Sequence, residues 1–387
     1  MKIDLITLQA VNNYGSVLQT FATQEFFRQF GCEVRVINYL RSTSNNGQIL
    51  LNVIKRNIST LPAKVMYRFF LQKRVNAVFD SFRREYLNMS GEKLYRSLAD
   101  FEGYESDADA FCTGSDQVWN SFWNSGILPE LYLAFVPEGK YRFAFSASFG
   151  KTEIEPEEVQ DTQKYIDAYK HISVREDSAV KILKEQYHYN NAVHVLDPTL
   201  CLSGNTWRKY VENTNGGGAL RNEPYILVYN AYGTTRDFDS YAAAFSQKTG
   251  LKLVELYTSS GDFFTNIFRH KHLIRPSSVF EFLALIDNAR CIITDSFHGT
   301  AFALNLNTEP VCIFPKRFSG RLESILRLTG TLDRRVRSMD DFSVMDRPVD
   351  FGHVNSVLDC ERRKVSNWLN MVLAEIREHN AKKEAHP

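Results

Sequence analysis

The sequence lacks an excess of charge of either sign. Lysine and arginine total 46 and aspartate and glutamate total 45, which leaves a formal net charge of +1 over 387 residues. A chain balanced in this way has no global positive field to attract a polyanion, so we expect no nucleic-acid partner. Any site for a small anion has to be built locally.

Long hydrophobic runs and a cysteine framework are also missing. The longest apolar runs, such as residues 225–229, are strand-sized and far short of the roughly 20 residues that span a bilayer. The first residues do not have the pattern of a secretory signal, so we expect a cytoplasmic protein. The 6 cysteines are scattered without a C-x-x-C pair, which predicts reduced core thiols and no structural zinc site.

The two common nucleotide-binding motifs are absent. Neither G-x-x-x-x-G-K-[ST] nor G-x-G-x-x-G occurs in the chain. The sequence therefore supports neither an ATP-binding P-loop nor a Rossmann dinucleotide site.

What the sequence does contain is a regular alternation of short apolar strands with longer helical segments. This alternation predicts βαβ units and mostly parallel sheets. The expected strands are residues 3–8, 34–39, 108–113, 141–146, 171–174 and 193–196, and then 225–229, 251–256, 272–274, 291–294 and 311–314.

The pattern divides into two parts at a glycine-rich segment, residues 213–222, which is the best linker candidate. We predict two Rossmann-like α/β domains, residues 1–215 and 219–387, that face a cleft where a ligand can bind. Residues 50–100 have helical spacing and predict a helical insertion in the first domain. A last helix, within residues 356–386, is a candidate to pack back on that domain.

Two helix starts carry a capping-box pattern, in which a serine precedes a glutamine or glutamate by three positions. Ser16 with Gln19 predicts the start of the first helix, and Ser278 with Glu281 predicts the start of a later one.

Polar loops that directly follow the expected strands are candidate binding sites, because ligands of such sheets bind beyond the carboxyl ends of the strands. Residues 294–300 place His298 at a helix start, where free N–H groups and the helix dipole favour an anion. Helix capping is an alternative role for His298. Arg175 precedes two acids and could equally form an ordinary ion pair, and residues 114–117 could form either an anion-binding nest or a plain turn.

Six segments together resemble the polysaccharide pyruvyl transferase family. The resemblance implies a GT-B-like fold and transfer of the enolpyruvyl group of phosphoenolpyruvate to two hydroxyls of a hexose. The products would be a cyclic pyruvate ketal and phosphate. Family context further suggests a capsular or exopolysaccharide precursor on a polyprenyl diphosphate, with peripheral contact at the inner membrane surface. The matching segments, in chain order, are residues 13–19, 114–120, 147–150, 173–176, 196–200 and 294–302.

The resemblance also implies roles for single residues. His298 matches a general acid and Arg175 matches an arginine that grips phosphoenolpyruvate, while Asp295 and Asp116 are candidates to orient or deprotonate a sugar hydroxyl, with structural capping as the alternative. The chain departs from the family at Ser296, where other members carry a second arginine. Lys316, Arg317 or Arg321 is expected to replace that charge. Further donor-binding candidates are Ser296, Gly299 and Thr300, and acceptor-binding candidates are Asn13, Tyr14, Ser16, Ser115, Gln117, Trp119 and Ser148. The implied chemistry requires no metal and no cofactor besides the donor substrate.

Two other functions remain open from the sequence. A GT-B glycosyltransferase that uses a nucleotide sugar would have the same two-domain shape. A family member that binds a glycan without catalysis is the second alternative, because Ser296 replaces a charged residue of the family pattern.

Overall fold

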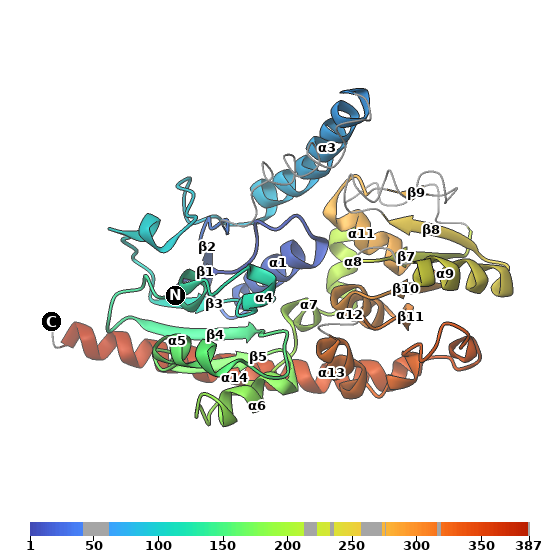
Figure 1. The fold of residues 1–387 in the computed structure, drawn as a ribbon. Coiled ribbons are helices and arrows are strands. Elements are labelled where there is room, and N and C mark those ends of the chain that lie inside the picture. The colour runs from blue at the N-terminus through green and yellow to red at the C-terminus, as the bar shows by residue number, and fades with distance from the viewer. Residues whose placement is uncertain are drawn as a thin grey trace.

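The computed structural model describes residues 1–41, 62–212, 223–232, 236–256, 273–274, 276–315 and 319–385. They form two separate parallel sheets flanked by helices (Figure 1). Every strand expected from the sequence is present, with small differences at the ends. The glycine-rich segment 213–222 lies outside the described residues.

The first sheet has six strands in the order β2-β1-β3-β4-β5-β6. The chain reverses its direction of travel across the sheet between β1 and β3, which makes their carboxyl ends the switch point where ligands of such sheets bind. The strands are β1 (Lys2–Ile6), β2 (Glu33–Val36), β3 (Ala110–Thr113), β4 (Tyr141–Ala147), β5 (His171–Val174) and β6 (Val193–His194).

The second sheet has five strands in the order β11-β10-β7-β8-β9, with its own switch point between β7 and β10. β7 and β10 are buried along their whole length, as expected of central parallel strands covered on both faces. The strands are β7 (Tyr225–Tyr229), β8 (Lys252–Leu256), β9 (Leu273–Ile274), β10 (Cys291–Thr294) and β11 (Glu309–Cys312).

The helices that position the site begin at the carboxyl ends of these strands. Helix α12 (Phe297–Leu306) is buried on all sides, which fits its almost wholly apolar sequence. The other α-helices are α1 (Tyr14–Arg28), α3 (Pro62–Tyr86), α4 (Ser121–Asn124), α5 (Pro156–Ile166), α6 (Asp177–Glu185), α7 (Pro198–Cys201), α8 (Gly204–Glu212), α9 (Arg236–Thr249), α11 (Val279–Asp287), α13 (Gly320–Leu328) and α14 (Phe351–Ala385).

Within the described residues, the expected insertion is α-helical over α3 and ends in a short 3-10 helix at Leu98–Phe101. Its buried residues Phe79 and Phe82 pack among aromatic rings of both halves, including Tyr14 and Phe280. After Leu87 the chain continues in extended conformation beside β2, with bridges from Met89 and Tyr95. Residues 50–61 of the predicted insertion lie outside the described part of the chain.

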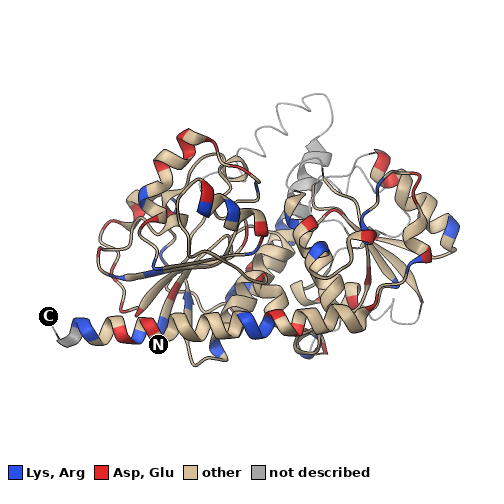
Figure 2. Ribbon diagram, turned by 90° about the horizontal axis from the view of Figure 1, so that it is seen from below, with Lys and Arg blue, Asp and Glu red and all other residues tan. Residues whose placement is uncertain are grey.

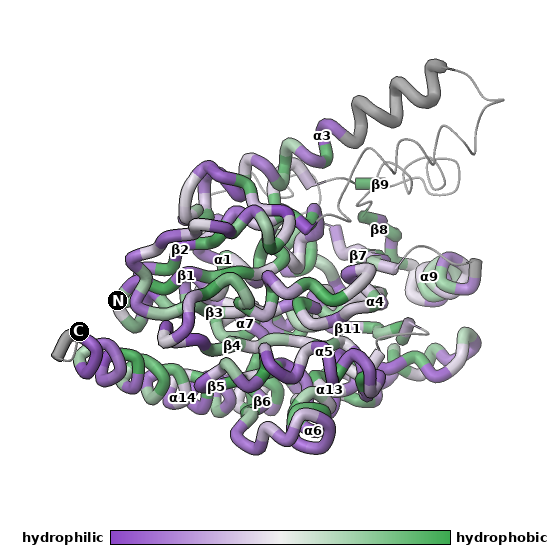
Figure 3. The backbone as a smooth tube through the Cα atoms, turned by 60° about the vertical axis from the view of Figure 1, so that its left-hand side comes forward, coloured by the Kyte–Doolittle hydropathy of each residue, from purple (hydrophilic) through white to green (hydrophobic). Residues whose placement is uncertain are grey.

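Helix α14 has 35 residues and runs along both halves of the molecule (Figure 2). Hydrophilic and hydrophobic residues alternate along it, as expected of a helix with one face against the protein (Figure 3). Its C-terminal part contacts the first sheet, where Trp368 stacks on Phe145 at 6.0 Å and the Asn380 side chain donates to the Asp109 carbonyl at 3.1 Å. Among the described helices, none is long and apolar enough to cross a membrane.

The two predicted capping boxes have different outcomes. Helix α11 begins as predicted, with Ser278 Oγ accepting from the Glu281 N–H. The prediction for Ser16 and Gln19 is wrong, because α1 is capped earlier by Asn13, whose side chain accepts from the Gly15 N–H. Asparagine caps as well as serine does, and the earlier start places Ser16 inside the helix.

Candidate active site

The switch points of the two sheets face each other across a small cavity of about 60 Å³. Both halves of the chain contribute to its walls. The polar residues that line it are Asn13, Ser16, Asp116 and Gln117 from the first half, and Tyr232, Ser296, His298 and Arg321 from the second.

His298 lies in the first turn of α12 but does not cap it. Ser296 is the N-cap, and its Oγ accepts from the Gly299 N–H at 3.2 Å. The imidazole packs directly on Gly15, where an added Cβ would lie 2.0 Å from Nδ1. The other ring nitrogen, Nε2, is buried without a hydrogen-bond partner and lies 3.8 Å from Asp197 Oδ2. His298 therefore lines the polar cavity and has one ring nitrogen without a hydrogen-bond partner.

Burial lowers the pKa of His298 to about 4, and the nearby carboxylates of Asp197 and Asp116 only partly oppose this effect. The imidazole is therefore neutral near neutral pH in the free protein.

Arg175 is the centre of a buried ion cluster behind His298. Its side chain is completely buried, Nη1 donates to Asp197 at 2.9 Å, and Nη2 donates to Asp116 at 3.2 Å. Ser16 Oγ donates to the second oxygen of Asp116 at 2.6 Å, and Ser115 Oγ donates to Asp197 at 2.9 Å. The guanidinium does not line the cavity, so in this structure Arg175 holds two carboxylates in place around the imidazole.

Neighbouring cationic groups outweigh the effect of burial on both carboxylates. Burial alone would raise the pKa of Asp116 and of Asp197. Arg175 is the main group that keeps the pKa of Asp116 below its usual value, and His298, followed by Arg175, does the same for Asp197. Asp116 also has a φ of 75°, a left-handed conformation that aspartate tolerates better than most residues.

Asp295 has a different environment from that of Asp116. Its Oδ1 accepts from the Ala231 N–H at 2.7 Å and its Oδ2 from the Tyr232 N–H at 3.3 Å, so it fixes the loop after β7. Burial raises the pKa of Asp295 to about 6. Its carboxylate does not line the cavity.

Arg321 supplies a cation at the cavity. It lies at the start of α13, and its Nη2 donates to the hydroxyl of Tyr232 at 2.5 Å. Its guanidinium lies 5.8 Å from the ring of Phe297, and its Nε is buried without a hydrogen-bond partner. Lys316 and Arg317, the other candidates for this charge, lie outside the described residues.

The remaining candidates divide into residues at the cavity and residues inside the core. Asn13, Ser16, Gln117 and Ser296 line the cavity. Thr300 is buried with its hydroxyl 3.3 Å from Cys312 Sγ, and Gly299 packs against Thr294 and Tyr229. Four acceptor candidates interact inside the protein and not with the cavity. Tyr14 stacks on Phe282, while Ser115 donates to Asp197, Trp119 to the Leu131 carbonyl and Ser148 to Glu176.

Sequence reasoning assigned no role to Asp197, although this carboxylate contacts both Arg175 and His298. The sequence feature that could have identified Asp197 is its position directly after an expected strand, in the segment 196–200 that carries part of the family resemblance.

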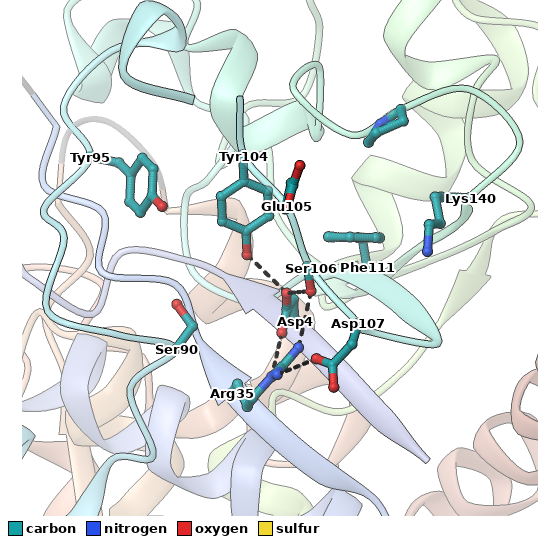
Figure 4. Close-up of a pocket in the computed structure, with 11 residues that line it drawn as sticks. Asp4, Arg35, Ser90, Tyr95, Tyr104, Glu105, Ser106, Asp107, Phe111 and Lys140 are labelled. Atoms are coloured by element: carbon teal, nitrogen blue, oxygen red, sulfur yellow. Dashed lines mark hydrogen bonds and ion pairs between the residues drawn. The ribbon is translucent and has the colours of Figure 1, made fainter. Parts of the chain in front are cut away.

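A larger pocket of about 620 Å³ lies elsewhere, beside β1 and β2 (Figure 4). Its central carboxylate, Asp4, accepts from Arg35 Nε and from the Tyr104 hydroxyl, each at 2.8 Å, and also from Ser106. None of the residues drawn there belongs to the loops around His298. Because its polar groups already pair with one another, this pocket is a weaker candidate.

The described residues contain no group of three or more histidine, cysteine, aspartate or glutamate side chains placed to hold a metal ion.

Solved structures similar to this chain are sugar-nucleotide enzymes of the GT-B-like fold. The UDP-GlcNAc 2-epimerase from Neisseria meningitidis is 10% identical, with a TM-score of 0.52 over 97% of this chain and 100% of that one. The enzyme from Methanocaldococcus jannaschii, bound to UDP-GlcNAc and UDP, is 14% identical, with a TM-score of 0.53 over 94% of each chain. At such identities the likeness establishes the fold alone, and this chain has the GT-B-like fold predicted from its sequence.

Among curated proteins the comparison found no match to this chain. The family model described as polysaccharide pyruvyl transferase matches residues 13–313. This range begins at the N-cap of α1, ends after β11, and includes His298 and its carboxylate partners. The chain belongs to the polysaccharide pyruvyl transferase family.

Proposed function

We propose that the protein transfers the enolpyruvyl group of phosphoenolpyruvate to two hydroxyls of a hexose, with formation of a cyclic ketal and release of phosphate. The observation that carries the proposal is the position of His298, which has an unpartnered Nε2 and lines the same cavity as Arg321. Family membership supports a saccharide acceptor.

Arg321 is the donor-binding cation of this proposal. Its unpartnered Nε can donate to the phosphate or carboxylate of phosphoenolpyruvate, and such charge-assisted bonds are the stronger kind. The N-terminus of α12 adds a favourable dipole for the same anion. Arg321 would thus replace, from α13, the arginine that the family carries at the position of Ser296.

His298 is the general acid. An anionic donor beside the imidazole raises its pKa from about 4 and favours proton uptake, and Asp197 and Asp116 then stabilise the imidazolium. The proton passes from Nε2 to C3 of the donor while the oxygen of a sugar hydroxyl bonds to C2 and releases its proton to solvent. Phosphate then leaves C2, and the second hydroxyl adds there with loss of its proton. Arg175 is a positioning residue that holds both carboxylates, and Asp116 is placed to orient a sugar hydroxyl.

The acceptor in this proposal is a capsular or exopolysaccharide precursor on a polyprenyl diphosphate, met at the cytoplasmic face of the membrane. This part rests on the family resemblance. The absence of a cofactor other than the donor belongs to the same proposal.

The test is phosphate release from phosphoenolpyruvate with a panel of hexosides and lipid-linked saccharides. We expect release to require a sugar and to fall about 100- to 10,000-fold in His298→Asn, because a positioned proton donor contributes on that order. Phosphoenolpyruvate should still raise the melting temperature of that variant. In Arg321→Ala the thermal shift should be lost, whereas Arg363→Ala, which removes an exposed arginine of α14, should keep it.

Two outcomes would contradict the proposal. Stabilisation by UDP-glucose and not by phosphoenolpyruvate would indicate a nucleotide-sugar glycosyltransferase. Sugar binding without turnover, unchanged in His298→Asn, would indicate a glycan-binding protein.

A further inference from the structure

We infer that a groove beside the catalytic cavity binds the acceptor saccharide, with Phe122 stacking on the sugar ring and Glu176 accepting a hydrogen bond from a hydroxyl. The inference rests on the proposed function, because it takes a hexose as the acceptor. It assigns a separate place to that substrate.

The groove has a volume of about 770 Å³, within the usual range for small-molecule sites. Its walls are α4 with the start of α5 and α6 from the first half, and the start of α13 from the second. Arg321 lines both this groove and the cavity that contains His298. A ligand in the groove would therefore border the reacting centre, and the groove has the space for a sugar that the 60 Å³ cavity lacks.

Phe122 gives the groove an aromatic surface. It is 58% exposed, the largest exposure among the large hydrophobic side chains of the described residues. The next residue, Trp123, is 39% exposed and lines the cavity itself, where its ring lies 6.3 Å from that of Tyr232. Exposed aromatic rings that run from a polar groove to a polar cavity are suited to the apolar face of a sugar ring.

Glu176 gives the groove a fixed hydrogen-bond acceptor. The residue is 1% exposed, and its Oε1 accepts from Ser148 Oγ at 2.8 Å and from the Gly150 N–H at 3.1 Å. Its Oε2 has no hydrogen-bond partner, and Arg175 Nε lies 3.8 Å away. A buried acceptor left unpaired costs free energy, which a ligand hydroxyl would recover.

Glu158 repeats this arrangement at the same groove. Its Oε2 accepts from Ser121 Oγ at 2.6 Å and from Lys151 Nζ at 3.0 Å, while Oε1 is buried without a partner. In each of these two carboxylates the protein hydrogen-bonds one oxygen. The other oxygen has no hydrogen-bond partner, and in Glu176 it lies 3.8 Å from Arg175 Nε. Since a sugar is rich in hydroxyl donors, this pair fits a saccharide.

The negative charge of the groove favours the uncharged acceptor over the anionic donor. Four glutamates line it against two cations, so it disfavours an anion. The anionic donor is left to Arg321 at the cavity, and the uncharged hexose to the groove. The lining glutamates are Glu153, Glu155, Glu158 and Glu176, and the cations are Lys151 and Arg321.

The experiment measures sugar binding by saturation-transfer NMR on the full chain without phosphoenolpyruvate. The probes are methyl β-D-glucopyranoside and methyl β-D-galactopyranoside. Phe122→Ala should weaken binding about three- to tenfold, the equivalent of one aromatic contact, and Phe122→Tyr should restore it. Glu176→Gln should also weaken binding, because it replaces the free acceptor with a donor. Leu332→Ala, which shortens a 41% exposed side chain outside the groove, is the matched control.

The stabilisation by phosphoenolpyruvate should be the same in wild type and in Phe122→Ala. Equal sugar binding in wild type and Phe122→Ala, or no binding of either glycoside by the wild type, would overturn the inference. Because this measurement does not use the donor, failure of the proposed function would show separately, as a wild type that phosphoenolpyruvate does not stabilise.

Discussion

At the scale of single residues, the site is short of positive charge. Arg175 pairs with Asp116, Asp197 and Glu176, and the imidazole beside them is neutral in the free protein. Such a cluster favours the arrival of a proton at His298 once an anion offsets the cost of burying it. The imidazole would therefore become protonated only when the donor is bound, which is when the reaction needs a general acid.

The pKa of His298 makes a prediction for stability. A folded-state pKa of about 4 against an ordinary 6.5 means that the unfolded chain binds more protons between these pH values. Stability should therefore fall as the pH drops from 6.5 to 4, by up to about 3 kcal/mol for this one group. Urea unfolding between pH 7.5 and 4 should show the wild type losing this amount relative to His298→Asn.

The control for this prediction is His188→Asn, which replaces an exposed histidine. Its pH profile should follow that of the wild type. Parallel profiles for wild type and His298→Asn would mean that the imidazole does not resist protonation in the folded protein.

At the scale of elements, the site is the meeting of two helix starts from different halves of the chain. The first turn of α1 contributes Gly15 and the first turn of α12 contributes His298, and the two are in direct contact. A side chain at Gly15 has no space, because its Cβ would lie 2.0 Å from the imidazole Nδ1.

Gly15→Ala should therefore displace the imidazole or separate the two helix starts. We expect turnover to fall at least about 100-fold, the effect of losing a positioned proton donor, with the fold retained. Phosphate release and circular dichroism measure the two effects. Gly352→Ala, where the nearest atom is a surface Asp350 oxygen at 3.2 Å, should keep full activity. An active Gly15→Ala enzyme would show that His298 need not lie against α1.

The elements themselves could be predicted because their patterns are local. Continuous apolar runs such as residues 291–294, bounded by polar loops, identify central parallel strands without tertiary information. The first residue of α1 could not be predicted from the local sequence, since Asn13 and Ser16 are both good N-cap residues. The contact that settles it, Ser16 with Asp116, joins residues 100 positions apart.

The candidate site was predictable in part for the same reason. His298 and Asp116 follow strands, and loops after strands are where ligands bind. Whether a polar residue faces the cavity or the core depends on the rotation of its helix or turn. The sequence could therefore not show that Ser296 and Ser16 line the cavity while Thr300 and Ser148 lie in the core. Asp197 gains its importance from Arg175, which only the fold brings to it.

At the scale of the whole molecule, the structure has a closed cleft held by contacts from several elements. Arg327 of α13 pairs with Asp177 of α6 at 2.9 Å, and the rings of Trp123 and Tyr232 meet over the cavity. α14 and α7 also contact both halves. The cavity of about 60 Å³ is far smaller than the neighbouring groove of about 770 Å³, so we expect the halves to separate when a donor as large as phosphoenolpyruvate enters.

We therefore predict that the free protein opens in solution and that phosphoenolpyruvate closes it. Arg321 and His298 would hold the donor on the second half, while Asn13, Ser16 and Gln117 of the first half line the opposite wall of the cavity. A bound donor should therefore draw the two halves together. Small-angle X-ray scattering should show a radius of gyration that falls when the donor is added, from a value above the roughly 21 Å of a compact chain of this length. Arg321→Ala should remain open at the same donor concentration. Identical scattering curves for the wild type with and without donor would contradict this prediction, and would require the donor to bind outside the cavity of His298.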